Sequence, residues 1–286
     1  MNNTIGGFVA KIVKKDFVEA LARGLDVIKA FSNTSPVMTC AQVAAKVGLA
    51  RPTTHRLLLT LQSLGYVRND ASGFSLTPRV VDLGMAYISA RSIWDSARPH
   101  MEELVKVADQ SCSISQLDGS DTVYVARVSA PKILSMTVNV GTRSPARSTS
   151  MGDVLLAGLG DDELHHALSK PSLSTLKARL SRTDEELSLV LPQVRRQGWA
   201  SSDERLSFGI RAISVPITDC QGRTAAALSI AVHSTEVTID HLHESYLPLL
   251  QAAGEKIRAD WAKINELPMS NTAPEGNFAS TSSELN

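Results

Sequence analysis

Residues 39–66 read TCAQVAAKVGLARPTTHRLLLTLQSLGY, the pattern of two short helices joined by a tight turn. Thr39 and Gln42 have the spacing of a capping box, and Gly48 follows the first helix where a left-handed residue is favoured. Pro52 suits the first turn of the second helix, because the amide proton that proline lacks has no helical partner there. The stretch is therefore typical of a helix-turn-helix that reads DNA.

The second of these helices combines an apolar stripe with a polar face. The residues at helical spacing on the stripe are Thr54, Leu57, Leu58, Leu61 and Leu64. The residues predicted to contact DNA are Arg51, Thr53, Thr54, His55, Arg56 and Thr60, with Arg68 on the segment that follows. A solvated amphipathic helix would explain any one of them, but the two-helix spacing favours DNA.

Elements on both sides complete a winged helix-turn-helix domain, expected over residues 16–77 after a flexible arm over 1–15. Turn residues at 69–73 between short apolar runs predict a hairpin. Upstream, Leu21, Leu25, Ile28 and Phe31 share one face of a predicted supporting helix over 17–31. Residues 78–93 predict a linker helix, which could pair with its copy, because such domains normally read DNA as dimers.

Charge is divided between the two parts of the chain. Residues 1–79 hold ten Lys and Arg against four Asp and Glu, whereas residues 80–286 hold nineteen against twenty-five. The formal net charge of zero therefore hides a basic front and an acidic remainder. Because phosphate neutralisation supplies most non-specific affinity for DNA, the basic segment is where DNA binding requires it.

Composition limits the remaining classes. A length of 286 residues with 43% hydrophobic residues is ordinary for two globular domains. No apolar run approaches the roughly 20 residues of a spanning helix, and no charged leader precedes an apolar segment, so the expectation is no membrane. Three widely spaced cysteines indicate neither a disulfide framework nor a zinc site. We expect a cytoplasmic protein with no metal and no cofactor.

From residue 94 onward the pattern predicts an α+β domain over 94–264, followed by a disordered tail over 265–286. Helices are expected at about 95–109, 152–168, 183–197 and 239–263, and strands at 111–117, 122–128, 133–140, 211–217 and 223–232. An antiparallel sheet covered by helices is the economical fold for this order, and such sensor domains enclose a small pocket.

The sequence offers only poor candidates for catalytic or metal-ligating residues of an enzyme. His165 and His166 are adjacent and point apart on a helix, and His241 and His243 have no acid at ligand spacing. Cys112 and Cys220 show no activating base, which leaves thiol redox chemistry as a remote alternative. No catalytic residue is predicted. A pure protein-interaction module would leave the basic front domain unexplained.

Six segments carry a resemblance to the IclR family of transcriptional regulators across residues 16–263. They are DFVEALARGLDVIKAF, AAKVGLARPTTHRLLLTLQSLGYV, QLDGSDTVYVARV, VGTRSPARSTSMGDVLLAGL, VRRQGWASSDERLSFGIRAISVPI and GRTAAALSIAVHS. Two of them, VGTRSPARSTSMGDVLLA and DGSDTVYVARV, are similar to the branch that regulates aromatic-acid catabolism, including protocatechuate, 4-hydroxybenzoate and β-ketoadipate regulators. The resemblance implies a winged helix-turn-helix, a linker helix, a GAF-like effector domain, and homodimers that often pair into tetramers.

The effector pocket implied by the resemblance combines apolar and hydroxyl-bearing residues. The family positions map here onto Ile133, Met136, Ser150, Met151, Asp203, Ile210, Ala212, Ser229 and Ala231. Chemistry adds Ser148, Thr149 and Gly152, because hydroxyls and amides at a helix start favour a carboxylate. The alternatives stay open: Ser150 could be a plain N-cap with Asp153 completing a capping box, and the apolar members could be core.

Two positions depart from the family pattern. Many relatives have cysteine at the place of Ala212, and most have Lys or Arg at the place of Asp153. We expect Asp153 to place a negative charge near the pocket rim, which would disfavour a dianionic effector. Arg143 and Arg147 are possible counter-charges or solvated surface arginines.

The sequence therefore predicts an effector-responsive regulator of a catabolic operon. Its expected partners are double-stranded operator DNA, a small aromatic acid or pathway intermediate, a second copy of the chain and, for an activator, RNA polymerase. A regulator of the same family that senses a short 2-oxo acid or an uncharged efflux-type effector is the alternative.

Overall fold

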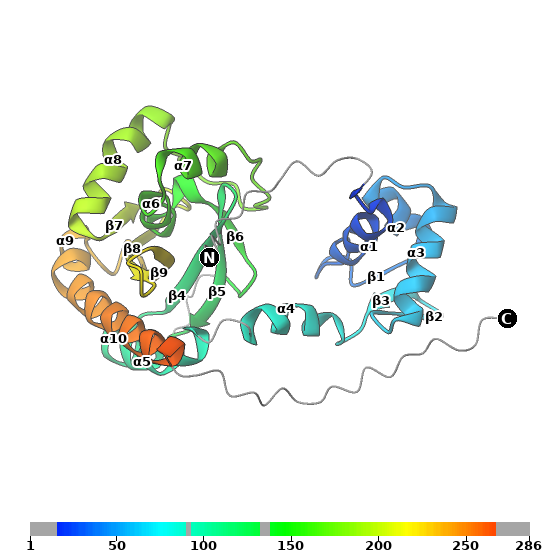
Figure 1. Cartoon of the computed structure of the whole chain (residues 1–286), viewed down its shortest axis with the longest axis horizontal. Helices are drawn as coiled ribbons and strands as arrows, with labels where there is room; N and C mark the ends of the chain where they lie inside the picture. Colours follow the sequence, from blue (N-terminus) through cyan, green and yellow to red (C-terminus); the bar gives the residue numbers. More distant parts are fainter. Residues whose placement is uncertain (1–15, 90–92, 132–137, 267–286) are drawn as a thin grey trace. The chain divides into compact units, whose positions relative to one another are not determined.

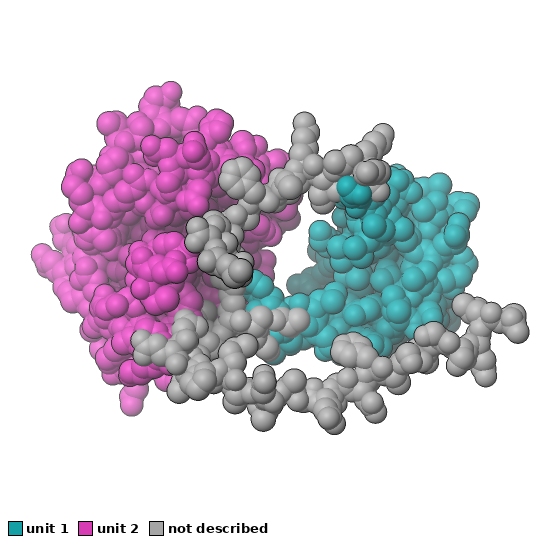
Figure 2. Space-filling model, viewed as in Figure 1, with its two compact units in different colours: residues 1–91 teal, residues 92–286 magenta. Residues whose placement is uncertain are grey.

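The computed structural model describes residues 16–89, 93–131 and 138–266, and the chain divides into two compact units, residues 1–91 and 92–286 (Figure 2). The expected arm over 1–15 and residues 267–286 of the expected tail lie outside the described residues. So do two candidate pocket residues, Ile133 and Met136, and most of the strand expected at 133–140. Of that strand, residues 138–140 are described and are not in a strand.

The first unit is a winged helix-turn-helix. Its helices are α1 (Glu19–Lys29), α2 (Cys40–Val47), α3 (Arg51–Ser63) and α4 (Val80–Ser89), and its strands β1 (Val37–Met38), β2 (Val67–Asp70) and β3 (Gly73–Leu76) form one antiparallel sheet in the order β1-β3-β2 (Figure 1). Strand β1 was not predicted, because it has only two residues and no turn signal beside it.

Local signals at the helix ends behave as predicted. Thr39 caps α2 in a capping box with Gln42, and Gly48 ends α2 in the left-handed conformation with φ 66°. Pro52 lies in the first turn of α3. Such signals are local hydrogen-bond and dihedral requirements, so they can be read from neighbouring residues alone.

The supporting helix buries only the end of the face that was expected, because Ile28 and Phe31 pack against the core of the first unit. Val27 of α1 is fully buried in the core of the first unit, but Leu21 and Leu25 are 64% and 42% exposed. The prediction of one buried face is therefore right for Ile28 and Phe31 and wrong for most of the surface of Leu21 and Leu25. Periodicity marks a face that can be buried, but it does not say how much of the helix the core covers.

The second unit is built on an antiparallel sheet. Its strands are β4 (Cys112–Asp118), β5 (Asp121–Val128), β6 (Arg143–Pro145), β7 (Ala200–Asp203), β8 (Ile210–Thr218) and β9 (Thr224–His233), in the order β6-β5-β4-β9-β8-β7. Its helices are α5 (Ile93–Ala108), α6 (Ser150–Ala157), α7 (Asp161–Leu168), α8 (Asp184–Gln197), α9 (Ile239–His241) and α10 (Leu247–Glu266). The α+β prediction is confirmed.

Helices cover both faces of this sheet (Figure 1). Strand β8 alternates Ile213, Val215 and Ile217 with Ala212, Ser214 and Pro216, and β9 alternates in the same way. The aliphatic face lies under α5 and α10, since Cys112 on that face contacts the Met101 carbonyl of α5. The face of small and polar side chains lies under α6, since Ser214 hydrogen bonds to Ser150.

Several elements differ from the sequence prediction. The helix expected at 152–168 is two helices, α6 and α7, because Gly158 and Gly160 separate them. The final helix contains a π-helical turn over Leu242–Tyr246 between α9 and α10. Strands β6 and β7, with three and four residues, were not predicted. No described helix is long and apolar enough to cross a membrane.

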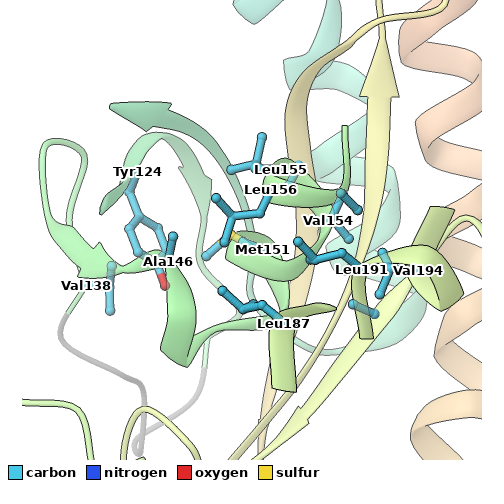
Figure 3. Packing of buried hydrophobic residues seen from close by; sticks show 13 residues of the cluster. Tyr124, Val138, Ala146, Met151, Val154, Leu155, Leu156, Leu187, Leu191 and Val194 are labelled. Atoms are coloured by element: carbon cyan, nitrogen blue, oxygen red, sulfur yellow. The ribbon is translucent and has the colours of Figure 1, made fainter. Parts of the chain in front are cut away.

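Helix α6 is the centre of the core beneath the small-residue face. All eight of its residues are buried, and Figure 3 shows side chains of α6, α8 and β5 gathered around it. Its first turn lies directly against the backbone of the 3-10 turn Ala146–Ser148, because a Cβ built at Gly152 would stand 1.9 Å from the Ala146 carbonyl oxygen. Only glycine permits this approach.

We therefore expect Gly152→Ala to lower the free energy of unfolding of the second unit by roughly 3 kcal/mol, through overpacking. Gly254→Ala in α10 is the matched control: its new Cβ would meet only ordinary contacts, 3.4 Å from Val215, so stability should rise by up to about 1 kcal/mol. Thermal and urea unfolding followed by circular dichroism checks both values. Equal stability of the two variants would contradict the close approach of α6 to the Ala146 backbone at Gly152.

Candidate functional sites

The exposed face of α3 is the first candidate site. Arg51, His55 and Arg56 are exposed on it, and Arg68 is exposed on β2 with Nε donating to Ser75 Oγ at 2.9 Å. Thr54 is fully buried and donates through Oγ1 to the Ala50 carbonyl at 3.2 Å. The prediction that Thr54 contacts DNA is therefore wrong, because its helical position places it in the core with the apolar stripe.

The arginines of α3 are not neutralised by neighbouring carboxylates, whereas the charge of Arg68 on β2 acts on nearby Asp70, whose pKa is lowered chiefly by hydrogen bonds from Ser72. Among the described residues, Arg51, Arg56 and Arg68 form no ion pair. Arginines of the second unit do: Arg143 pairs with Asp118, and Arg211 pairs with Asp203 at 2.7 Å. A guanidinium without a carboxylate keeps its full attraction for a phosphate.

A groove runs beside this face, between α1 and α3. It is lined by Thr53, Arg56, Thr60 and Leu64 of the α3 region, by Leu21 and Leu25 of α1, and by Leu83 of α4, among others. The exposed apolar residues Leu21, Leu25, Leu64 and Leu83 make it a hydrophobic surface. Thr53, Arg56 and Thr60 therefore lie at the edge of the groove, whereas Arg51 and His55 do not line it.

The second candidate site is a cavity between α6 and the small-residue face of the sheet. Its described lining residues are Ser113, Tyr124, Arg127, Val138, Thr149, Ser150, Met151, Ser202, Leu206, Ile210, Ala212, Ser229 and Ala231. Strands β4, β5, β7, β8 and β9 supply the floor, and the start of α6 supplies the opposite wall. The mixture of apolar walls and a few polar groups is typical of a small-molecule site.

Seven of the residues expected at this pocket line the cavity: Thr149, Ser150, Met151, Ile210, Ala212, Ser229 and Ala231. Three others do not line it. Ser148 is buried with Oγ 2.7 Å from Ser181 Oγ, and Gly152 packs on Ala146. Asp203 is bound to Arg211. The expectation that Asp203 faces a ligand is therefore wrong in this structure.

Six lining residues were missed: Ser113, Tyr124, Arg127, Val138, Ser202 and Leu206. Arg127 carries the only charge among the described lining residues, and it lies inside the segment QLDGSDTVYVARV that the resemblance had already marked. Its alternation with Tyr124 along β5 is broken by a register shift between Ile114 and Ser115 on the partner strand. The pattern of β5 alone does not show that both face one side.

Asp153 does not stand at the pocket rim. It is fully buried and forms salt bridges with Arg182 at 3.2 Å and with Arg205. The expectation of a negative charge at the rim is therefore wrong, because two guanidinium groups compensate this carboxylate inside the protein. Its partners Arg182 and Arg205 lie 29 and 52 residues away along the chain, so the pattern of residues around Asp153 could not predict these salt bridges.

The start of α6 is already capped. Thr149, not Ser150, is the N-cap, and its Oγ1 accepts from the Gly152 amide at 2.9 Å. Ser150 Oγ lies 2.7 Å from Ser214 Oγ instead. Arg147 pairs with Asp184 at 2.5 Å, and Arg143 pairs with Asp118 and Asp121, so both proposed counter-charges are engaged outside the cavity.

The histidines and cysteines considered above do not gather into one site in the part of the chain that the structure describes. No group of His, Cys, Asp and Glu there could hold a metal ion. Burial raises the pKa of the Cys112 thiol to about 12, so a reactive thiolate does not form there at neutral pH. His165 and His166 are exposed, and His243 packs against Trp199 with the two rings tilted by 55° and has Nε2 2.9 Å from Ser201 Oγ.

Comparison with family models identifies both units. Residues 20–71 match the model described as the IclR helix-turn-helix domain. Residues 85–259 match the model described as bacterial transcriptional regulator IclR C-terminal. The second match alone spans more than half of the chain.

Individual proteins agree with the family models. The chain is 38% identical over 246 residues to the Pca regulon regulatory protein of Pseudomonas putida, covering 85% of this chain and 84% of that protein. It is 32% identical over 254 residues to the p-hydroxybenzoate hydroxylase transcriptional activator of Acinetobacter baylyi, covering 87% and 93%. An IclR homolog from Microbacterium hydrocarbonoxydans, solved with 4-hydroxybenzoate, superposes with TM-score 0.73 at 24% identity, covering 85% and 99%.

The unpaired arginines of α3 generate a prediction about DNA. Arg56→Ala should weaken binding to operator DNA selected from genomic fragments by roughly 1–3 kcal/mol, because a contact to a base edge or phosphate is lost. Gel-shift titration at several salt concentrations measures this. Arg196→Ala, an exposed arginine on α8, removes the same charge from the second unit and should leave affinity unchanged. Unchanged affinity and salt slope in both Arg51→Ala and Arg56→Ala would exclude this face.

The Asp153 cluster generates a prediction about stability. Asp153→Asn should lower the free energy of unfolding by about 3–5 kcal/mol, because it leaves two partly buried guanidinium groups uncompensated. Asp184→Asn is the control, since the Asp184 side chain is 81% exposed and its pairing with Arg147 is worth about 1 kcal/mol or less. Urea unfolding measures both. Similar losses of unfolding free energy in the two variants would contradict a special contribution of the buried Asp153 cluster.

Proposed function

The chain belongs to the IclR family of bacterial transcriptional regulators, and from that premise we propose that it controls an operon of aromatic-acid catabolism in response to a small carboxylated effector. It is a DNA-binding transcriptional regulator, in agreement with both family models and with the names of its relatives. The observation that carries the proposal is the pairing of an exposed, uncompensated arginine face in one unit with a lined cavity in the other.

In this proposal α3 enters the major groove of operator DNA. Arg51, His55 and Arg56 contact bases and neighbouring phosphates, and Arg68 on the wing contacts the backbone. The support comes from the exposure of these side chains and from the positive surplus of residues 1–79. The engaged arginines of the second unit would contribute little to phosphate binding.

The effector occupies the cavity beneath α6. Relatives named for the pca regulon and for p-hydroxybenzoate hydroxylase support an aromatic acid or its ring-cleavage product, and a protein of the same fold holds 4-hydroxybenzoate. The cavity leaves only about 30 Å³ for the centre of a water molecule, room for a water and not for a ring. An effector therefore enters only when a wall moves, which links occupancy to conformation.

The protein acts as a homodimer or a dimer of dimers in the cytoplasm, with RNA polymerase as a further partner for an activator. The support for a dimer is the groove of α1, α3 and α4, where Leu21, Leu25 and Leu83 are each more than 40% exposed. A second copy that covered the apolar residues of α1 and α4 would remove them from water while leaving the exposed arginines of α3 to DNA.

Calorimetry of the full chain against hydroxybenzoates, protocatechuate, phthalates and short 2-oxo acids tests the proposal. One aromatic acid should bind and change operator affinity, and saturating operator should change its affinity by the same factor. Ser150→Leu and Ala212→Val should weaken binding by filling the cavity, whereas Ser188→Leu, exposed on α8, should not. Binding of a 2-oxo acid or an uncharged compound alone would overturn the aromatic-acid reading and leave the regulator intact.

A further inference from the structure

The groove between α1 and α3 exposes large apolar side chains of the first unit. Leu21 and Leu25 of α1 are 64% and 42% exposed, and Leu64, which follows α3, is 52% exposed. The groove has a volume of about 730 Å³, far more than isolated water molecules need. Contiguous apolar surface of this kind marks a place where another segment or chain docks.

The groove follows α1 along nearly the whole length of the helix. Its lining residues on α1 run from Glu19 to Ile28, and those on α3 run from Thr53 to Leu61. A helix rises 1.5 Å per residue, so the nine steps from Glu19 to Ile28 make the groove roughly 14 Å long. A helical occupant of about two and a half turns would match this length.

The segment that precedes α1 in the chain has the sequence of such an occupant. Residues 1–15, which lie outside the described residues, read MNNTIGGFVAKIVKK. Five of its large apolar side chains recur at i, i+3, i+4, i+7 and i+8, the spacing of an amphipathic helix: Ile5, Phe8, Val9, Ile12 and Val13. The eight steps from the first to the last of them give a stripe roughly 12 Å long. Lys11, Lys14 and Lys15 fall outside this stripe.

The connection to α1 allows this segment to turn back along the helix. Val18, immediately before α1, has an extended backbone with φ −84° and ψ 90°, so α1 does not continue into the residues before it. Residues 14–18 join the apolar stripe to α1, and five extended residues reach roughly 17 Å. Packed helices lie only about 8–10 Å apart. So short a connection gives the segment a high effective concentration at its own groove, which favours it over the same segment of a second copy.

We propose that residues 5–13 form an amphipathic helix that docks in the groove between α1 and α3 of the same chain, with its apolar stripe on Leu25 and Leu64. Docking removes apolar side chains of both partners from water, which is its driving force. A second copy of the chain would then meet the docked segment and α4, where Val81 and Met85 are exposed outside the groove. The docking does not depend on which effector the second unit binds.

Amide hydrogen exchange of the full-length chain tests the docking. Phe8→Ser removes a side chain from the apolar stripe, and Lys11→Ser is the matched control outside the stripe. Phe8→Ser should speed the exchange of α1 amides by about tenfold or more, because losing the burial of one large apolar side chain weakens docking by about 10- to 100-fold and leaves α1 uncovered. Lys11→Ser should leave the exchange rates unchanged. Equal exchange in the two variants and in the wild-type chain overturns the inference.

A synthetic peptide of residues 1–15 measures the occupancy of the groove. It should bind a chain that lacks residues 1–13, and it should bind the full-length chain at least about tenfold more weakly, because the tethered segment competes. In the shortened chain Leu25→Ser should weaken peptide binding by about tenfold, whereas Leu189→Ser, 76% exposed on α8, should not.

The other outcomes identify other occupants. Equal binding of the peptide to both chains indicates an empty groove and overturns the inference. An absence of binding to the shortened chain also overturns it, and sedimentation then shows whether a second copy fills the groove. Where the shortened chain fails to fold, the exchange of the full-length variants decides. Binding of operator and effector by the full-length chain tests the proposed function separately.

Discussion

The alternation of side chains along β4, β8 and β9 is the constraint on which the second unit depends. Leu228 and Ile230 face α5 and α10, while Ala227 and Ser229 face α6. Side chains in a strand repeat every two residues, so a slip of one residue would place serines in the aliphatic layer and aliphatic side chains in the cavity. One register therefore creates both the core and the space for a ligand.

Helix α6 covers the small-residue face of the sheet and forms the opposite wall of the cavity. Gly152 lets its first turn lie on the backbone at Ala146, and the buried carboxylate of Asp153 joins it to Arg182 and Arg205. The Arg205 carbonyl accepts from the Leu180 amide at 2.8 Å, and the adjacent Leu206 lines the cavity. Three segments distant in sequence are thus joined by one buried ion cluster beside the cavity.

The distribution of ion pairs explains how a chain of zero net charge serves two roles. In the described part of the second unit many arginines form salt bridges with carboxylates, which neutralise the arginine charge locally. The arginines of α3 and the wing hold none among the described residues, so their charge faces solvent. Because such charges act by releasing counterions from DNA, affinity for operator would fall steeply with salt.

Sequence patterns determined the features that depend on neighbouring residues. The capping box of Thr39 and Gln42 and the left-handed Gly48 are local and were predicted correctly, and the hairpin of β2 and β3 was predicted with a turn longer than the two residues, 71–72, that separate its strands. The order of helices and strands in the second unit was also readable, apart from short strands and the break at Gly158. Periodicity reports these features because hydrogen bonds and dihedral angles within one element produce them.

Only the tertiary structure decided which distant groups meet. Thr54 has a hydroxyl that could contact DNA, but its position on α3 is buried. Asp153 was expected near the pocket rim, but it is buried and forms salt bridges with two arginines from other segments. Arg127 gives no sign in β5 of its place in the cavity, because that place depends on the register with β4 and on α6 above it. Cross-strand partners and packing layers are properties of the assembled chain, and local periodicity does not contain them.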